Sequence, residues 1–321
     1  MVWWREFSGN AAQPGDGVMT SGILYVAIGE RWCREASEAA TLVKRHMPGL
    51  PITLFADRPW AAEAIDDVRV MKADGNPLLT KTLWMADSPY DRTLFLDTDI
   101  TLCDSIAEIF ALCDRFDLAV PHAPYRLAQM GLAAGLPEFL REGVPECFPG
   151  MNTGMLVYNR CDRVTAFFTA WCQHHIRHCA ITPHAPSQPA FRTAIYQSDL
   201  RFAIIPEEYH CRFIYPFKVC GRVKVFHGRH PDMDLVARRI NASPLPRVGE
   251  GYLVEAARRD RRLSRLQRWR SWAIGTLRRG VFRALRNVLP KAGGAETDAP
   301  LPPPDHAAQQ EIPNGGIVSL V

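Results

Sequence analysis

This chain of 321 residues has no long apolar run, no paired-cysteine motif and no internal repeat. No window approaches the roughly 18 consecutive apolar residues that a membrane-spanning helix needs. The segment from Met1 to Phe7 lacks a basic stretch followed by an apolar one, which is the pattern of a secretory signal. These absences predict a protein that is neither integral to a membrane nor exported by the signal-peptide route.

The nine cysteines are too scattered to form a recognisable framework. Their number is odd and none of them belongs to a CxxC pair, which argues against a disulfide scaffold and against a zinc ribbon. Reduced cysteines are typical of the cytoplasm. The cysteine pattern therefore predicts a cytoplasmic protein.

Basic charge is concentrated in one segment near the C-terminus. The net charge is +4, yet residues 258–286 alone contain eleven arginines. Within residues 254–289, apolar side chains recur at spacings of three and four between these arginines, which predicts an amphipathic basic helix. Its apolar stripe with Trp269 and Trp272 favours an anionic membrane surface. Two alternatives stay open for this helix: it could bind nucleic acid, or it could pack on its own domain or on a partner protein.

The periodicity of the first part of the chain predicts an α/β fold. Apolar strands at residues 22–28 and 51–56 enclose a helix at 35–46, which is the βαβ unit of a parallel sheet. Further strands are expected at 67–71, 94–96, 118–121, 151–159, 201–205 and 223–226, and further helices at 79–88 and 165–178. The first 120 residues thus have the doubly wound character of nucleotide-binding domains.

Changes in composition along the chain predict four parts. The body is a folded domain that ends where proline and then arginine become frequent. The last residues, rich in proline, are expected to be disordered. The predicted parts are a flexible leader at 1–20, the α/β domain at 21–235, the basic amphipathic helical segment at 236–291 and a disordered tail at 292–321.

Two carboxylates one residue apart form the most informative motif of the chain. Asp97 and Asp99 follow the apolar run Leu94–Leu96, and a buried strand there would deliver both to the carboxyl edge of the sheet, where open α/β sheets bind ligands. Such pairs hold Mg²⁺ or Mn²⁺, which bind phosphate oxygens. His227, at the end of a later strand and before Gly228, offers an imidazole to the same site. We therefore predict Asp97, Asp99 and His227 as metal ligands.

The order of the motifs over residues 21–231 resembles a GT-A glycosyltransferase of the glycogenin-like family 8. The resemblance is carried by Lys81-Thr-Leu-Trp-Met, by the segment Tyr90–Ile100 with its DxD, by Met151-Asn-Thr-Gly-Met and by the late Phe226-His-Gly. It implies a GT-A-like, Rossmann-like nucleotide-sugar-binding sheet flanked by helices. It also implies Mn²⁺ or Mg²⁺, a UDP-sugar as the favoured donor and retention of anomeric configuration.

The resemblance also implies roles for individual residues. Lys81 would contact phosphate or the donor sugar, and Gly228 and Arg229 would face the diphosphate, with Arg229 in place of a lysine that the family motif has and this chain lacks. An Asp-Gln pair of the family is here Ser187-Gln188, so Gln188 joins Asp99 as the catalytic candidate. The expected donor-binding residues are completed by Asn152, Thr153 and Gly154 at the sugar, and by Ala27, Ile28 and Gly29 at the base and ribose.

The sequence thus predicts a metal-dependent glycosyltransferase that moves a sugar from a nucleotide diphosphate to a hydroxyl. Its acceptor would be a glycan, a lipid-linked molecule or a protein, and the basic helix favours a membrane-associated acceptor at the inner membrane face. Two alternatives stay open. Asp97-Thr-Asp99-Ile-Thr101 also fits the DxDxT signature of haloacid-dehalogenase-type phosphatases, with Asp97 as nucleophile. The basic helix could instead define a membrane or nucleic-acid adaptor.

Three histidines on the helix expected at 165–178 are a weaker signal. His174, His175 and His178 have a spacing that can bind zinc, but no acidic or cysteine companion has a suitable spacing. We expect a solvent-facing position for them. The aromatic residues at 167–171 of the same helix are expected in the core.

Overall fold

The computed structural model describes residues 19–73, 77–123, 143–181 and 185–251. All of these belong to the first of two parts into which the chain divides, Met1–Val254. The predicted leader up to residue 18, the middle of the loop-rich stretch at 123–149, the basic helix at 254–289 and the tail at 292–321 lie outside the described residues. No helix among the described residues has the length and apolar character needed to cross a bilayer.

A seven-stranded sheet forms the centre of the fold, in the order β3-β2-β1-β4-β7-β6-β8. Neighbouring strands are parallel except that β7 runs antiparallel to both β4 and β6. Side chains on both faces of the inner strands are buried, which is why these strands read as continuous apolar runs. The strands are β1 (Ser21–Ala27), β2 (Ile52–Ala56), β3 (Asp67–Val70), β4 (Arg92–Leu96), β6 (Leu118–Pro121), β7 (Met155–Asn159) and β8 (Phe202–Ile205).

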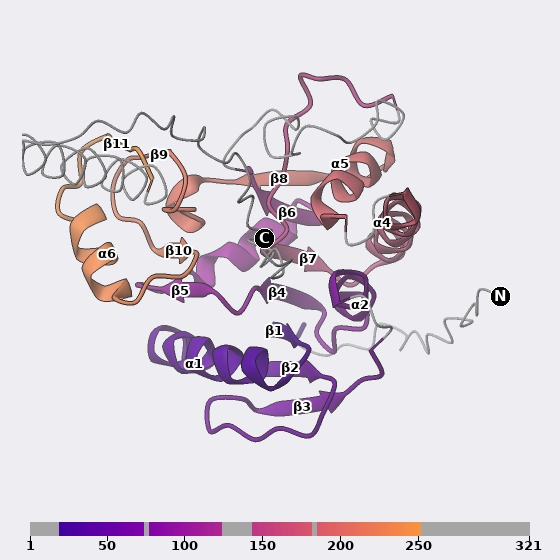
Figure 1. Cartoon of the computed structure of the whole chain (residues 1–321), viewed down its shortest axis with the longest axis horizontal. Coiled ribbons are helices and arrows are strands. Elements are labelled where there is room, and N and C mark those ends of the chain that lie inside the picture. Colours follow the sequence, from indigo (N-terminus) through magenta and orange to yellow (C-terminus); the bar gives the residue numbers. More distant parts are fainter. Residues whose placement is uncertain (1–18, 74–76, 124–142, 182–184, 252–321) are drawn as a thin grey trace, which may run out of the picture. The chain divides into compact units, whose positions relative to one another are not determined.

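Helices cover both faces of this sheet (Figure 1). On one face, α1 (Glu30–His46) and the 3-10 helix η1 (Ala107–Asp114) pack against alternate strand residues such as Ile23. On the other face, α2 (Pro77–Met85), α4 (Asp162–Ile181) and α5 (Ser187–Gln197) pack against the intervening ones such as Leu24. The predicted α/β class, with a sheet flanked by helices, is confirmed.

Two small ribbons lie beside the central sheet. Strand β5 (Ile100–Leu102) pairs with β10 (Val225–His227), and β9 (Phe217–Val219) pairs with β11 (Arg247–Gly249), all antiparallel. Between β10 and β11 lies α6 (Met233–Ile240), and the 3-10 helix η3 (Glu207–Tyr209) follows β8. The domain boundary predicted at residue 235 falls inside α6, whose Val236 packs into a core cluster with Phe213 and Phe226. The cluster therefore continues beyond residue 235 through the rest of α6, with Ala237 and Ile240 packed against it.

Several elements differ from the sequence-based expectation. Helix α1 begins five residues earlier than expected, at Glu30, because Gly29 takes the positive φ of 96° from which the helix starts. The strand expected at 151–159 begins only at Met155. A turn precedes it, in which the Gly154 N–H donates to Asn152 Oδ1 at 2.9 Å. Helix α5 and strands β5, β9 and β11 have patterns too short or too mixed to stand out.

The expected solvent-facing position of the α4 histidines is wrong. His174, His175 and His178 are all buried, as are the aromatic residues one turn earlier, which were expected in the core. The three histidines lie on the faces of α4 that α2 and α5 cover, whereas Gln173 and Arg177 of the same turns are exposed. His175 Nε2 lies 2.9 Å from the carbonyl oxygen of Ala185, whereas neither ring nitrogen of His178 has a hydrogen-bond partner within the described residues.

Acid should therefore unfold the protein partly through His178. Burial, with smaller contributions from His174, His175 and Arg177, lowers the pKa of His178 to about 4. In the unfolded chain a histidine titrates near 6.5. Because the folded-state pKa is the lower one, stability is complete above about pH 6.5 and falls as the pH drops toward 4. We expect a loss of roughly 2 kcal/mol between pH 7 and pH 5 from this residue.

Urea unfolding at pH 7 and pH 5 measures this effect. The variant His178→Phe removes the titrating group and keeps a ring in the space, so its stability should fall by roughly 2 kcal/mol less between the two pH values than that of the wild type. Histidines that do not interact with His178 contribute equally to both proteins and cancel in the comparison. An equal pH dependence of wild type and variant would contradict the assignment.

Candidate functional site

Polar residues gather where the parallel strands of the sheet end. Strands β1, β2 and β4 end at Ala27, Ala56 and Leu96, so the residues that follow them lie at one edge. Gly29 N–H donates to Asp57 Oδ1 at 3.0 Å there. Strand β7 is antiparallel and begins at this same edge, where the carbonyl oxygen of Gly154 accepts from the Asp97 N–H at 2.7 Å. The topology thus brings Asp97, Asp57 and the turn before β7 to the carboxyl edge, where the sequence predicted a ligand site.

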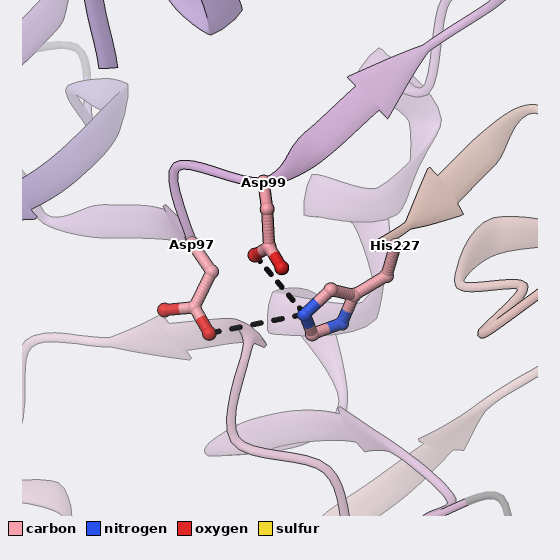
Figure 2. Close-up of side chains that lie close together, drawn as sticks. All are labelled: Asp97, Asp99 and His227. Atoms are coloured by element: carbon pink, nitrogen blue, oxygen red, sulfur yellow. Dashed lines mark ion pairs between the residues drawn. The ribbon is translucent and has the colours of Figure 1, made fainter. Parts of the chain in front are cut away.

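The β5–β10 ribbon brings the distant histidine to the two carboxylates. Its register places His227 opposite Ile100, next to Asp99. The Gly228 N–H donates to the Asp99 carbonyl oxygen at 3.0 Å, which fixes the two chains at this point. Figure 2 shows the result, with the Asp97 and Asp99 carboxylates and the His227 ring pointing toward one another.

The three side chains have the spacing of ligands to one cation. His227 Nε2 lies 3.2 Å from Asp99 Oδ1 and 4.0 Å from Asp97 Oδ2. All the ligand atoms lie within 4.8 Å of one another, and no other group of this kind occurs in the described part of the chain. An octahedral ion with bonds near 2.1 Å separates neighbouring ligands by about 3 Å and opposite ligands by about 4 Å. Two carboxylates and one imidazole are donors that suit Mn²⁺ or Mg²⁺.

Two cationic side chains hold the carboxylates without occupying the ligand atoms. Lys81 Nζ lies 2.5 Å from Asp97 Oδ1, and Arg229 Nη1 lies 3.2 Å from Asp99 Oδ2. The oxygens that face His227 are the other two, Asp97 Oδ2 and Asp99 Oδ1. A metal ion could therefore bind these oxygens and leave both ion pairs intact. Lys81 and Arg229 orient the carboxylates and add positive charge beside them.

His227 presents an unprotonated nitrogen to this pair of oxygens. Arg212 Nη1 lies 3.2 Å from His227 Nε2, and a guanidinium group can only donate. His227 Nε2 must therefore carry a lone pair. Burial lowers the pKa of His227 well below its ordinary value, which agrees with a neutral ring. Three acceptor atoms thus converge with no proton between them, an arrangement that a cation would stabilise.

Helix α1 supports the site from one side. Glu35 accepts two hydrogen bonds from Arg229, at 2.5 and 2.9 Å, and a third from Thr98 Oγ1. The Arg229 guanidinium also lies over the ring of Trp32, 4.9 Å from its centroid. Glu35 and Trp32 therefore hold Arg229 against Asp99. Sequence reasoning missed both, because Glu35 lies 194 residues from its partner and belongs to no motif.

The other predicted site residues lie at varying positions relative to the three ligands. Gly154 touches them, because a Cβ built there would lie 2.3 Å from His227 Cε1 and 2.8 Å from Asp97 Oδ2. Gly228 has a φ of 131°, which favours glycine.

Asn152 and Thr153 are buried in the turn before β7. Ala27, Ile28 and Gly29 lie at the end of β1, and Gln188 is half-buried in the first turn of α5. The ligand contacts predicted for these residues stay predictions.

Comparisons with known proteins give structural similarity at low sequence identity. No protein-family model matches the chain, and no curated relative does. A solved structure of the galactosyltransferase LgtC, in complex with donor and acceptor sugar analogues, matches with a TM-score of 0.47 and 14% identity, covering 65% of this chain and 87% of that one. The glycosyltransferase GlyE of Streptococcus pneumoniae TIGR4 matches with a TM-score of 0.45 and 15% identity, covering 66% of this chain and 55% of that one. Mouse xyloside xylosyltransferase 1 matches with a TM-score of 0.44 and 14% identity, covering 65% of this chain and 98% of that one.

Proposed function

We propose that this chain is a metal-dependent glycosyltransferase that moves a sugar from a nucleotide diphosphate, by preference UDP, to a hydroxyl group. The observation that carries the proposal is the convergence of Asp97 Oδ2, Asp99 Oδ1 and His227 Nε2 at the carboxyl edge of the sheet. This edge is where open α/β sheets bind nucleotides. Lys81 and Arg229 beside the carboxylates add the positive charge that a diphosphate needs.

The proposed chemistry is stabilisation of the leaving diphosphate. Mn²⁺ or Mg²⁺ held by Asp97, Asp99 and His227 would neutralise charge on the phosphate oxygens as the bond to the sugar breaks. Lys81 uses one N–H on Asp97, whereas Arg229 uses one on Asp99 and two on Glu35, and both keep further N–H groups to donate to phosphate oxygens. Since these groups are held in place before the substrate arrives, little reorganisation is needed at the reacting bond.

The remaining roles follow the predicted arrangement. The base and ribose would lie against Ala27–Gly29 at the end of β1, with Asp57 close by because it accepts from the Gly29 N–H. The donor sugar would lie near Asn152–Gly154. Gln188 would face the anomeric carbon in a reaction that retains configuration. The acceptor would be a glycan or a lipid-linked hydroxyl at a membrane surface, with residues 254–289 as the anionic-lipid contact of a cytoplasmic enzyme.

The phosphatase alternative finds less support in the structure. Phosphatases with the DxDxT signature have a fold that usually opens with the strand before the two aspartates. In this chain β1, α1 and β2 all precede β4, the strand before Asp97. The phosphatase mechanism also assigns no role to a buried histidine beside the two aspartates. His227 is held between these carboxylates and Arg212, which a cation site explains and a covalent aspartyl-phosphate mechanism does not.

Release of the nucleotide from a panel of sugar nucleotides tests the proposal. The purified full chain would be incubated with UDP-, GDP- and CMP-linked sugars, with Mn²⁺ or with EDTA, and with a generic phosphomonoester as a control substrate. We expect slow, Mn²⁺-dependent release of UDP from one or a few UDP-sugars, because water replaces the absent acceptor. Phosphomonoester turnover without cleavage of any sugar nucleotide would instead establish the phosphatase.

A further inference from the structure

Behind the candidate metal ligand His227 lies a second buried histidine. His227 Nδ1 is 2.7 Å from His210 Nε2, and the two rings meet edge to face with their centroids 4.7 Å apart. Both side chains are almost fully buried. His210 follows η3 and is held there by two backbone hydrogen bonds, from its own N–H to Glu207 and from the His227 N–H to Cys211. The proposed ligand therefore has a partner on the nitrogen that faces away from the carboxylates.

The hydrogen-bond partners determine where the protons of this pair lie. Arg212 donates to His227 Nε2, so that nitrogen carries no proton. A neutral His227 must then carry its proton on Nδ1 and donate it to His210 Nε2. His210 Nε2 is consequently unprotonated, and the proton of His210 is on Nδ1. Arg212 as the donor at Nε2 and His210 as the acceptor at Nδ1 thus favour the same tautomer of His227.

The opposite tautomer would be favourable for His227 in the absence of His210. A proton on His227 Nε2 could donate to Asp99 Oδ1, which lies only 3.2 Å away. In that tautomer Nε2 carries a proton and has no lone pair for a metal ion, whereas the hydrogen bond from Arg212 leaves a lone pair on Nε2, which a metal ion could take in place of Arg212. An acceptor on Nδ1 favours the other tautomer, and partners of this kind orient metal-binding histidines in general.

This arrangement costs stability and so calls for a reason. The Nδ1 atom of His210 has no hydrogen-bond partner within residues 19–251 as the structure describes them. Leaving one buried N–H unsatisfied costs about 1–3 kcal/mol. A leucine or methionine could fill the same space without an unsatisfied buried N–H. Unlike these residues, His210 provides a hydrogen-bond acceptor for His227.

We propose that His210 is a positioning residue that keeps His227 in the tautomer able to bind a divalent cation. The proposal rests on the proposed function, in which Asp97, Asp99 and His227 hold Mn²⁺ or Mg²⁺. His210 touches no substrate atom and acts through His227 alone. Its effect should therefore appear in the protonation pattern of His227 before any metal is added.

Two variants of His210 separate its acceptor from its volume. His210→Gln keeps an oxygen that can accept from His227 Nδ1, whereas His210→Leu fills the space with no acceptor. His175→Leu, on α4, is the matched control, because it also removes a buried histidine with one hydrogen bond but lies outside the site. Each variant would be made in the full chain, and thermal unfolding would record what each loses in stability.

The first measurement is the ¹⁵N–¹H long-range spectrum of the metal-free proteins, which distinguishes the Nδ1–H from the Nε2–H tautomer of His227. We expect Nδ1–H in the wild type, in His210→Gln and in His175→Leu, and Nε2–H in His210→Leu. The second is the affinity for Mn²⁺, from electron paramagnetic resonance of the free ion. We expect a loss of about 10–100-fold in His210→Leu and of less than about 3-fold in the other two variants.

An unchanged tautomer in His210→Leu, or Nε2–H in the wild type, would overturn the role of His210. So would an unchanged Mn²⁺ affinity in His210→Leu. A wild type that binds no Mn²⁺ would instead overturn the metal in the proposed function. The tautomer spectrum, which needs no metal, still decides the role of His210 in that case, so the two failures are distinguishable.

Discussion

Replacing Asp99 by Asn is expected to reduce Mn²⁺-dependent cleavage of the sugar nucleotide by at least about 100-fold. The side chain is nearly buried, and its two oxygens serve different partners, with Oδ1 facing His227 Nε2 and Oδ2 facing Arg229. An amide of the same shape removes the negative charge; because Arg229 can only donate, the amide oxygen faces Arg229 and the NH2 group replaces the ligand oxygen that faced His227. Because Glu35 still holds Arg229, the surrounding structure should survive the change.

Thermal unfolding with and without MnCl₂ separates a binding defect from a folding defect. A ligand that binds only the folded state raises the melting temperature, by about 2.7 kcal/mol of added stability at 100 times its dissociation constant. We expect this rise in the wild type and its loss in Asp99→Asn, while the metal-free melting temperature changes little. Removing one carboxylate from a cluster of unprotonated acceptors relieves repulsion, which offsets the lost ion pair with Arg229.

Asp104→Asn is the matched control for this prediction. Asp104 lies just after β5, five residues from Asp99, and its half-exposed side chain pairs with Arg222 at the surface. An exposed ion pair of this kind contributes about 0–1 kcal/mol, so the variant should keep its activity and its response to Mn²⁺. If Asp99→Asn also kept the wild-type Mn²⁺ dependence, these carboxylates would not be the metal ligands.

The sequence predicted the edge of the sheet that carries the site because two local signals coincided there. The continuous apolar runs of β1, β2 and β4 are what strands buried on both faces require, and Asp97 follows the last of them directly. Parallel strands present their carboxyl ends at one edge, so the position of the two carboxylates follows from the order of the elements. His227 could be predicted because it ends a recognisable strand before a glycine.

The partners of these ligands could not be predicted in the same way. Glu35, His210 and Arg212 belong to no motif, and each reaches the site through packing between segments distant in the chain. The alternation of His210 and Arg212 in an extended segment places both on one side, but two polar residues two apart are too common to be a signal. The burial of the α4 histidines could not be predicted for the same reason. It depends on packing against α5, a helix that the sequence pattern did not reveal.

Substitution of Gly154 by alanine is expected to have a comparably large effect through geometry alone. A Cβ at this position would lie 2.3 Å from His227 Cε1 and 2.8 Å from Asp97 Oδ2, so one of the two ligands must move. Neither can yield easily, because His227 is bonded to His210 and Asp97 is tied to Lys81 and to the Gly154 carbonyl oxygen. Displacement of a positioned group by about 1 Å can cost on the order of 100-fold in rate.

The prediction for Gly154→Ala is thus a loss of about 100-fold or more in Mn²⁺-dependent cleavage, with weaker Mn²⁺ binding, at a stability cost of about 1–3 kcal/mol from overpacking. Gly49→Ala is the control, because an added Cβ there meets no heavy atom within 4 Å and the backbone does not require glycine. Activity, Mn²⁺ affinity and urea unfolding would be measured on both variants. Wild-type activity in Gly154→Ala would mean that His227 and Asp97 tolerate displacement, and hence that they do not act together on one ion.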